Sequence, residues 1–442
     1  MPHELDRILI SASQPDFSER LMGIRVALGQ LAQFAPGDGK YEQLREIILN
    51  VNRNKDKAVA EYTERFDGVK LTPGQFLVRE EDLEKAHREI DTKLLESIRQ
   101  AIENVREYQA EIFIGKKKHP GIKYTSIKPV GICVPGASAP LPSTVIMTAV
   151  PAIVAGVEPE DIEVVSPPRY KPKPEAKGTI HPVTLAVCYE LGINRVYRVG
   201  GAQAVAALAS GTDTIRKVYK IVGPGSTWVQ MAKTVVFGVV DIDSLAGPSD
   251  VLIIANDKAN PAWVAADMLS QAEHAPGSGI VFTDSQKLAN EVLAELEKQV
   301  KQLDRTGETI RCLKDFSGIV VFDDMATIIT WANNFAPEHL EIQCGEQSRE
   351  IAAEIDNAGA IFIGDYSPVA VGDYWAGPSH TLPTGMRAWF FSGLTSNDFI
   401  KSTSIIEYDK EQLAESAEDI IRLAEVEGLD AHARSIKIRQ QD

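Results

Sequence analysis

Hydrophobic positions in the first part of the chain repeat with the period of an α-helix. Between residues 41 and 66 the apolar side chains recur about every 3.6 residues, as they do in a helix that buries one face. The positions concerned are Leu44, Ile47, Ile48, Val51, Ala58, Val59 and Tyr62. Residues 81–113 repeat the pattern, and the segment 115–120, which contains Gly and Pro, ends it. We therefore predict long amphipathic helices before residue 125.

From Lys128 the pattern changes to short apolar runs separated by Gly and Pro. These runs predict strands at 130–134, 162–165, 195–199, 220–222, 251–254, 279–282 and 318–322. Helical segments stand between the strands, at 143–157, 202–209, 226–236 and 260–274 among others. Strands that alternate with helices are typical of parallel sheets with helices on their faces. The sequence therefore predicts the α/β class.

The C-terminal part has a third pattern. Residues 411–427 predict an amphipathic helix, and Gly428 suits the position just after its end. A basic tail at 431–439 follows. A lone terminal helix with a tail often packs on another subunit, so we predict a subunit contact here.

Length, charge and cysteine content narrow the class of protein. A chain of 442 residues suggests two or three domains. The formal net charge of −16 argues against nucleic acid or an anionic membrane as partner. The most apolar stretch, 143–157, is shorter than the roughly 20 residues of a membrane helix. The chain starts without an apolar leader, and its four cysteines contain no CxxC pair, so we predict a cytoplasmic protein with reduced thiols.

Two glycine turns, at 200–201 and 223–225, follow predicted strands and begin predicted helices. At such a turn the pyrophosphate of a dinucleotide can meet the N–H groups of a helix. The match to G-x-G-x-x-G is imperfect, because Trp228 takes the last position. A dinucleotide site and ordinary turns between strands and helices both fit this pattern.

Two polar pairs have spacings that suit chemistry. Gln271 and His274 stand three residues apart, so a helix places an oxygen and an imidazole on one face, where they can bind a metal. A histidine that interacts with the helix dipole is the alternative. Glu338 and His339 place a carboxylate beside an imidazole at a predicted helix start, which suits general acid–base chemistry. A structural glutamate and histidine are the alternative for this pair.

Further titratable residues lie in irregular segments. Asp373 and His380 belong to the stretch 372–384, whose Gly and Pro content predicts a loop, and site residues concentrate in loops. Glu427 and His432 flank the turn after the last helix. Solvated residues without a role are the alternative for all four. The sequence contains no GxSxG elbow, P-loop or CxxC, so serine hydrolase, NTPase and cysteine–zinc functions have no support.

Eight segments together resemble the histidinol dehydrogenase family, and the resemblance extends from about Glu46 to Arg439. The segments are VPGASAPLPSTVIM (134–147), VGGAQAVAAL (199–208), VGPGSTWVQMAK (222–233), DIDSLAGPSDVLI (241–253), DMLSQAEH (267–274), APEHLE (336–341), GDYWAGPSHTLPT (372–384) and EGLDAHARS (427–435). Each alone is modest evidence, but their order and spacing are very specific. The resemblance implies an α/β fold of two Rossmann-like parallel-sheet domains with helical N- and C-terminal extensions, in an intertwined homodimer.

Domain limits follow from the same resemblance. We expect an N-terminal arm at 1–25 and a first Rossmann-like domain formed by 26–125 and 250–385. A second Rossmann-like domain is expected at 126–249. The remaining residues, 386–442, are expected to form a helical tail that contacts the partner subunit.

The resemblance also implies roles for the matching residues. Zinc would be held by Gln271, His274, Asp373 and His432. His339 would take the alcohol proton as hydride leaves, and Glu338 would activate water for the oxidation of aldehyde to acid. Substrate contacts would come from Ser249, Gln271, His274, His339, Asp373, His380, Glu427 and His432, the last two reaching the partner's site. Cofactor contacts would come from Gln203, Ser226 and Cys133.

The implied function is the last step of histidine biosynthesis, a zinc-dependent four-electron oxidation of L-histidinol to L-histidine with two NAD+. Some positions depart from the usual family pattern: Cys133 replaces Tyr, Ala137 replaces Gly, Ser226 replaces Asn and Val369 replaces Glu. These departures keep open a paralogous NAD-dependent dehydrogenase of another small polar primary alcohol, such as a hydroxylated sulfonate. A non-catalytic homologue is a further alternative, against which the intact ligand and base sets argue.

Overall fold

The computed structural model describes residues 5–30, 37–136, 140–170, 178–274, 276–303 and 305–440. The chain divides into two compact units. Unit 1 comprises Met1–Ile114 and Ser126–Ile400, and unit 2 comprises Gly115–Thr125 and Lys401–Asp442. Ala137, one of the positions that depart from the family pattern, lies outside the described residues.

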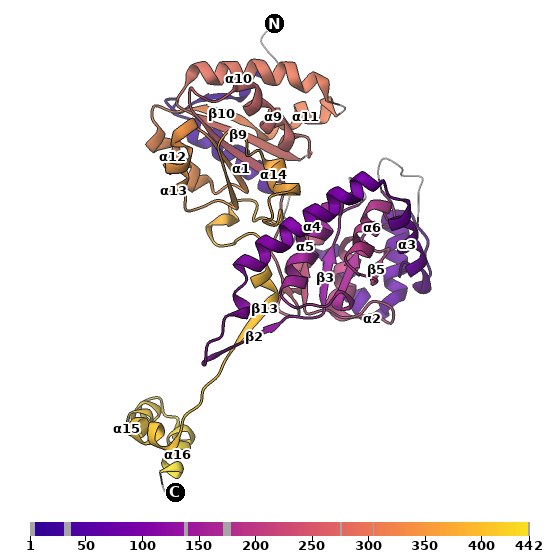
Figure 1. Cartoon of the computed structure of the whole chain (residues 1–442), viewed down its shortest axis with the longest axis vertical. Coiled ribbons are helices and arrows are strands. Elements are labelled where there is room, and N and C mark those ends of the chain that lie inside the picture. The colour runs from indigo at the N-terminus through magenta and orange to yellow at the C-terminus, as the bar shows by residue number, and fades with distance from the viewer. Residues whose placement is uncertain are drawn as a thin grey trace. The chain divides into compact units, whose positions relative to one another are not determined.

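Unit 1 contains a six-stranded parallel sheet of order β1-β10-β9-β8-β11-β12 (Figure 1). Its strands are β1 (Leu9–Ser11), β8 (Ser249–Ala255), β9 (Gly277–Thr283), β10 (Gly318–Val321), β11 (His339–Gln343) and β12 (Ala360–Ile363). The two faces are covered by α1 (Phe17–Gln30), α9 (Pro261–Ala272), α10 (Gln286–Gln299), α11 (Thr306–Phe316), α12 (Met325–Phe335), α13 (Ser348–Ala353) and α14 (Val369–Tyr374).

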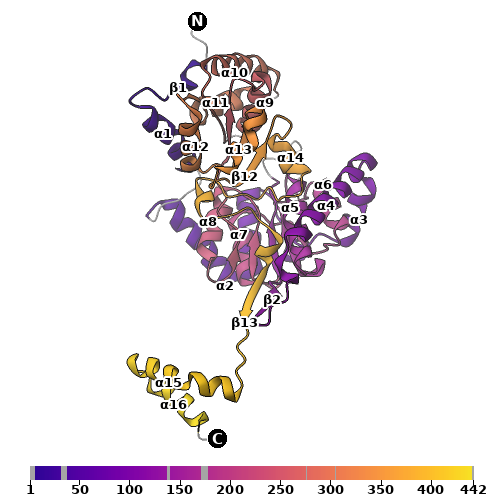
Figure 2. The ribbon, with the colours of Figure 1, turned by 60° about the vertical axis from the view of Figure 1, so that its left-hand side comes forward.

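Alternation along the strands of this sheet sends side chains into two separate cores. Val251 and Ile253 of β8 pack with α9, α10 and α11 on one face. Leu252 and Ile254 pack with α1, α12 and α13 on the other face, where α1 and α12 lie together (Figure 2). Successive residues of a strand point to opposite faces, so a continuous apolar run is what a sheet buried on both sides requires.

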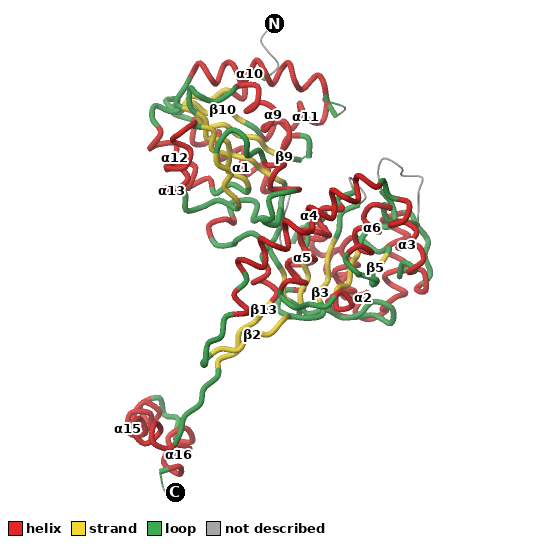
Figure 3. The backbone as a smooth tube through the Cα atoms, viewed as in Figure 1, coloured by secondary structure: helices red, strands yellow, loops and turns green. Residues whose placement is uncertain are grey.

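Unit 1 also contains a five-stranded parallel sheet of order β5-β4-β3-β6-β7 (Figure 3). Its strands are β3 (Val130–Cys133), β4 (Ile162–Val165), β5 (Val196–Tyr197), β6 (Lys220–Val222) and β7 (Asp241–Ile242). One face is covered by α3 (Glu80–Glu89), α4 (Thr92–Ile112), α5 (Pro142–Val154) and α6 (Pro182–Glu190). The other face is covered by α2 (Gly39–Asp67), α7 (Gly201–Ser210) and α8 (Thr227–Val236).

The packing of α2, α3 and α4 corrects one expectation. We expected residues 26–125 to join 250–385 in one domain, yet these helices share their cores with the five-stranded sheet. The expected arm 1–25 also contributes β1, which pairs with β10 at the edge of the six-stranded sheet. An amphipathic pattern reveals that a helix buries a face but not which sheet it covers. The exact domain limits stay a prediction.

Unit 2 contains two helices and most of a strand pair. β2 (Ile122–Ser126) pairs with β13 (Ile400–Ser404), and α15 (Lys410–Val426) is followed by α16 (Asp430–Arg439). Gly428 adopts a positive φ of 71° after α15, as predicted for a residue that ends a helix. The predicted basic tail, residues 431–439, lies in helix α16.

Short 3₁₀ turns complete the secondary structure of the described residues. They lie at Asp6–Ile8, Pro73–Gln75, Ile114–Lys116, Pro159–Asp161, Val300–Gln302, Gly345–Gln347, Arg387–Trp389 and Ser396–Phe399. None of the described helices is both long enough and apolar enough to cross a membrane.

The predicted class is confirmed, with local corrections. All seven predicted strands exist, although 195–199 shortens to β5. The segment 81–113 divides into α3 and α4, because Ile90 is extended after α3 and Asp91 caps α4 by accepting from Leu94 N at 2.9 Å. Glu338 and His339 do not begin a helix, since His339 is the first residue of β11. Asp373 lies on the short helix α14 rather than in a loop.

Candidate active site

Both sheets have the strand order of a Rossmann fold. Apart from the edge strand β1, the chain enters each sheet at a central strand, adds strands on one side and then returns to the other side, so two neighbouring strands are reached by crossovers in opposite directions. In the six-stranded sheet these neighbours are β8 and β11, and in the five-stranded sheet they are β3 and β6. Ligands commonly bind such sheets at the carboxyl ends of the strands at a switch point. The glycine turn after β6 lies at such an end, whereas the candidate catalytic residues of the six-stranded sheet lie at the opposite, amino ends.

The candidate catalytic residues gather at the amino ends of β8 and β11. Ser249 begins β8, and His339 begins β11 next to Val251 in parallel register. A helix that follows a strand runs back toward the amino edge, so the last turns of α9 and α14 bring Gln271 and Asp373 there. The fold thereby brings together residues that the sequence separates widely.

Glu338 is held on both its backbone and its side chain. Its N–H donates to Asp250 Oδ1 at 2.9 Å, and the N–H of Asp250 donates to Glu338 Oε2 at 3.0 Å. The hydroxyl of Ser249 lies 2.7 Å from the same Oε2. Within the described part of the chain, both of these hydrogen bonds end on Oε2, so Oε1 is the oxygen left for a further ligand.

The hydroxyl of Ser249 lies between Glu338 and Gln271. This hydroxyl has one hydrogen, yet Glu338 Oε2 and Gln271 Oε1 both lie within hydrogen-bond distance, at 2.7 and 2.8 Å. A proton on Glu338 completes this set, because Glu338 can then donate to Ser249 while Ser249 donates to Gln271. Burial raises the pKa of Glu338 to about 7, against the opposing charge of His339. Glu338 can therefore gain or lose a proton near neutral pH.

His339 is oriented through its ring nitrogens. Nδ1 lies 2.9 Å from the carbonyl oxygen of Asp250, which can only accept, so the neutral ring carries its proton on Nδ1. Nε2 is then the basic nitrogen. It is buried without a hydrogen-bond partner among the described residues and lies 3.9 Å from Asp373 Oδ1. A proton acceptor with no protein partner suits a group that receives a proton from a ligand.

His274, Asp373 and His380 lie within electrostatic reach of one another and of His339. Loss of hydration lowers the pKa of His274 and of His380, while the charge of Asp373 opposes this shift. His380 Nε2 is buried and has no partner among the described residues. The structure thus brings His380 to the group that the sequence patterns had singled out separately.

Gln271 and His274 fit a metal site only in part. The two side chains and Asp373 supply an amide oxygen, an imidazole and a carboxylate, which are ordinary zinc donors. Within the described residues, however, there is no group of at least three His, Cys, Asp or Glu side chains placed to hold a metal ion. The fourth implied donor, His432, is an exposed residue of α16 in unit 2. Glu427, at the end of α15, is exposed in the same unit.

The second switch point carries a turn that admits close backbone approach. Gly223 follows β6 with a φ of 103°, and a Cβ there would lie 2.4 Å from the carbonyl oxygen of Cys133 at the end of β3. The buried carboxylate of Asp243 accepts from Gly223 N at 2.6 Å and pairs with the buried ammonium of Lys233. The hydrogen bond to Asp243 fixes the backbone of this turn. The turn leads into helix α8, and a helix N-terminus is a suitable place for a phosphate group.

The other glycine turn follows β5, at the edge of the same sheet, and begins a helix with an unsatisfied buried amide. Gly200 has no room for a Cβ, which would lie 2.9 Å from Pro167, and Gly201 begins α7 with a φ of 71°. Gln203 is 1% exposed, and neither of its amide atoms has a hydrogen-bond partner in the described residues. A buried amide without partners is costly, so this position fits a polar ligand.

The other two implied cofactor contacts, Ser226 and Cys133, differ in their exposure to solvent. Ser226 is exposed just before α8, where it can meet a ligand. Cys133 is buried, and burial raises the pKa of its thiol to about 12. All four cysteines lie in the described residues, and all are free and buried. Cys133 is therefore an inert thiol at neutral pH.

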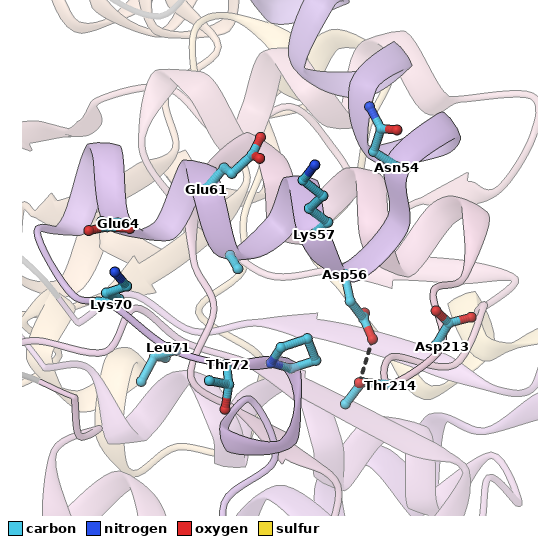
Figure 4. Close-up of a pocket in the computed structure, with 12 residues that line it drawn as sticks. Asn54, Asp56, Lys57, Glu61, Glu64, Lys70, Leu71, Thr72, Asp213 and Thr214 are labelled. Carbon is cyan, nitrogen blue, oxygen red and sulfur yellow. Dashed lines mark hydrogen bonds between the residues drawn. The ribbon is translucent and has the colours of Figure 1, made fainter.

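A surface hollow of about 720 Å³ lies apart from these residues (Figure 4). It is lined by α2, the segment 70–73 and residues 213–214. Asp56 points toward Thr214, whose hydroxyl donates to it at 2.6 Å (Figure 4). None of the predicted site residues lines this hollow, so it does not mark the candidate active site.

Pattern reasoning missed Asp250, Lys233 and Asp243. Asp250 is fully buried and contacts both Glu338 and His339. An acidic residue directly before an apolar strand was the available signal, because a buried carboxylate needs a partner.

Known proteins match this chain over most of its length. The family model for histidinol dehydrogenase matches residues 37–440. The histidinol dehydrogenase of Rhodopirellula baltica is 45% identical over 407 residues, covering 90% of this chain and 86% of that protein. That of Bacillus subtilis is 45% identical over 406 residues, covering 90% and 92%. The crystal structure of histidinol dehydrogenase from Elizabethkingia anophelis has a TM-score of 0.87 at 32% identity and covers 98% of each chain. The chain therefore belongs to the histidinol dehydrogenase family.

Proposed function

We propose that this protein oxidises L-histidinol to L-histidine with two NAD+ in the cytoplasm, as the last step of histidine biosynthesis. Family membership supports the substrate. The observation that carries the proposal is the pairing of two different proton acceptors at one strand edge. His339 Nε2 is buried without a partner, and Glu338 titrates near neutral pH. Two oxidations in sequence need a base for an alcohol and a base for water.

His339 serves the first oxidation in this proposal. Its Nδ1–H is committed to the Asp250 carbonyl, so Nε2 takes the proton of the alcohol as hydride leaves the adjacent carbon. Glu338 serves the second oxidation, in which it takes a proton from the water that attacks the aldehyde. Its raised pKa makes the carboxylate a stronger base than an exposed glutamate.

Gln271, His274, Asp373 and His432 hold zinc in this proposal. Bound zinc would polarise the substrate oxygen and accept the substrate's nitrogen donors. The protein's own contribution is to orient the donors, as Ser249 does for Gln271 through the hydrogen bond of 2.8 Å.

In this proposal, NAD binds at the second switch point. Gln203 and Ser226 contact it there, and Cys133 lies beside it. The proposal rests on the unpartnered amide of Gln203 and on the braced turn at Gly223.

Substrate contacts complete the proposal. Ser249 and His380 reach the substrate from unit 1, together with the zinc-binding and catalytic residues. Glu427 and His432 come from the partner of a homodimer with shared active sites. A carboxylate such as Glu427 suits the ammonium group of an amino alcohol.

A second candidate is a paralogous dehydrogenase of another small polar primary alcohol, such as a hydroxylated sulfonate. One observation favours it. Val369 stands where the family commonly has Glu, and its side chain is 2% exposed within the apolar core. A carboxylate is therefore missing at the start of α14, four residues before Asp373.

The test is the yield of NADH from limiting L-histidinol, with and without a chelator. About two NADH per histidinol, abolished by chelation and restored by zinc, is the expected result. No NADH from folded, zinc-loaded protein would reject the histidinol assignment and favour the second candidate, for which hydroxylated sulfonates are the next substrates to assay.

A further inference from the structure

Arg25 is a buried arginine of α1 that serves three acceptors. Nη1 donates to Asp250 Oδ2 at 3.0 Å, and Nη2 donates to the carbonyl oxygen of Ala336 at 2.9 Å and also to that of Phe335. Its side chain is 4% exposed and that of Asp250 is 0% exposed. The guanidinium carbon lies 3.7 Å from the centroid of the Phe335 ring.

These acceptors surround the Glu338–His339 pair. Phe335 ends α12, and Ala336 follows with a φ of 46°, a left-handed conformation that a residue with a Cβ adopts at a cost. Arg25 binds both carbonyls on this approach. On the other side, Asp250 contacts the backbone and carboxyl of Glu338 and the ring of His339. The guanidinium of Arg25 thus connects the turn before Glu338 and His339 to Asp250, the residue that orients them.

We propose that Arg25 is a positioning residue for Glu338 and His339. It acts through Asp250 and through the carbonyls of Phe335 and Ala336, and it touches no substrate. The proposal rests on the proposed function for the role of the pair. Arg25 also precedes the residues that match the family model, 37–440, so the contact comes from the N-terminal helix outside that match.

The chemistry of the side chain explains why arginine is needed. A guanidinium holds its donors in a fixed planar fork, whereas a lysine ammonium is a compact point charge. Replacement of a whole buried ion pair by well-packed apolar side chains is often neutral for stability, although removal of one partner alone is strongly destabilising. The value of this pair therefore lies in geometry, and a displacement of about 1 Å in a catalytic group can cost on the order of 100-fold in rate.

The experiment compares Arg25→Met and Arg25→Lys with Arg7→Met. Arg7 is a matched control, because it pairs with Asp315 at 2.8 Å but both side chains are exposed. kcat and KM for the alcohol are measured at a temperature at which circular dichroism shows each protein folded. We expect Arg25→Met to lower kcat by about 100-fold with KM changed by less than about threefold. Arg25→Lys recovers part of kcat, since it keeps the charge, and Arg7→Met behaves as wild type.

Three results would overturn the proposal: an unchanged kcat in folded Arg25→Met, a loss of activity equal to the loss of folded protein, or an equal loss in Arg7→Met. If Arg25→Met does not fold, Arg25→Lys is held to the same criteria. If wild-type protein does not oxidise histidinol, the proposed function fails independently of the proposal for Arg25. A crystal structure of Arg25→Lys then tests the positioning role. Displacement of Glu338 within an unchanged sheet supports the positioning role, and Glu338 in its original place contradicts it.

Discussion

At the scale of single residues, the site depends on how Glu338 is desolvated. Burial is the largest influence on its carboxyl and raises the pKa to about 7, while the nearby His339 limits the rise. The N–H of Asp250 and the hydroxyl of Ser249 stabilise the charged form and keep it accessible. A fully exposed glutamate would be ionised throughout the neutral range and would be a weaker base.

Replacement of Glu338 by Gln should separate the two oxidations. The amide keeps the shape of the side chain but cannot take a proton from water, so alcohol oxidation should survive better than aldehyde oxidation. We expect the aldehyde step to slow by roughly 10²- to 10⁴-fold, and NADH yield to fall toward about one per histidinol. Single-turnover assays that start from the alcohol and from the aldehyde measure the two steps. Glu346→Gln, at an exposed glutamate, is the control, and equal slowing of both steps by Glu338→Gln would contradict the assigned role.

The pH dependence of the aldehyde step should report the same carboxyl. The ionised form acts as the base, so the rate should rise with pH and reach half its maximum near pH 7. Single-turnover oxidation of the aldehyde over a pH series on both sides of neutrality tests this. The rise should be absent from the residual activity of Glu338→Gln. A flat profile in the wild-type protein would show that another group supplies the base.

Residue patterns singled out Glu338, His339 and Asp373, which lie together in the structure, but not the groups that orient them. The first three stand in unusual local contexts, which a sequence displays directly. Arg25 and Asp250 are 225 residues apart, and their partnership exists only because α1 packs beside the start of β8. Long-range contacts of this kind leave no local periodicity or spacing to detect.

At the scale of elements, a buried carboxyl pair joins the parts that carry the site. Asp267 of α9 and Glu341 of β11 are hydrogen-bonded to each other, and Gln343 Nε2 donates to Asp267 at 2.7 Å and to Glu341 at 3.0 Å. Glu341 also accepts from the N–H of Val369, the first residue of α14, at 2.9 Å. Burial and the adjacent Asp267 raise the pKa of Glu341 well above 4.5, so the pair shares a proton.

This proton makes a pH-dependent contribution to stability. Because the pKa of Glu341 is higher in the folded than in the unfolded chain, folding takes up a proton above about pH 4.5. The contribution is complete below that pH and is lost as pH rises through the raised pKa. Glu341→Gln removes the titration while keeping a donor for Asp267, so the free energy of unfolding should decline less steeply with pH. The difference should approach about 1.4 kcal/mol for each pH unit of the window.

Urea unfolding of wild type and Glu341→Gln at several pH values measures this difference. Glu346→Gln serves as the exposed control and should keep the wild-type slope. Parallel declines in wild type and Glu341→Gln would show that the pair does not hold a proton in the folded state.

Sequence patterns predicted the elements with plain apolar runs and missed those without them. β8, β9 and β10 are nearly all apolar, so their position is evident. β11 is equally buried but contains His339, Glu341 and Gln343, whose polar side chains hide the strand. His339 belongs to the candidate site, and Glu341 and Gln343 belong to the carboxyl cluster, so the pattern failed where polar side chains have local partners.

At the scale of the whole molecule, unit 2 holds the two implied site residues that unit 1 lacks. α15 and the turn after it expose Leu423, Val426 and Leu429 at 67%, 83% and 41%. Exposed apolar side chains in a small helical unit suit contact with another protein surface. The proposed homodimer supplies such a surface.

His432→Ala tests whether unit 2 contributes to a metal site. Removal of one imidazole from four donors should lower zinc affinity on the order of 10- to 100-fold or more. Zinc content after dialysis against a weak chelator is the measurement. His119→Ala, at an exposed histidine of the same unit, is the control. Full zinc retention by His432→Ala would remove His432 from the proposed ligands.

Sharing of sites between subunits can be tested by mixing two inactive variants. In a homodimer in which each subunit supplies His432 to its partner's site, a Glu338→Gln chain paired with a His432→Ala chain forms one site with both defects and one intact site. Random pairing makes half of the dimers mixed, so histidine formation should recover to about a quarter of the wild-type rate.

Co-expression with two different affinity tags, followed by sequential purification, isolates the mixed dimer and shows that the chains have exchanged. Purified mixed dimer should then reach about half of the wild-type rate, because one of its two sites is intact. If both residues act within one chain, each site of the mixed dimer carries one defect, and activity stays at the level of the single variants.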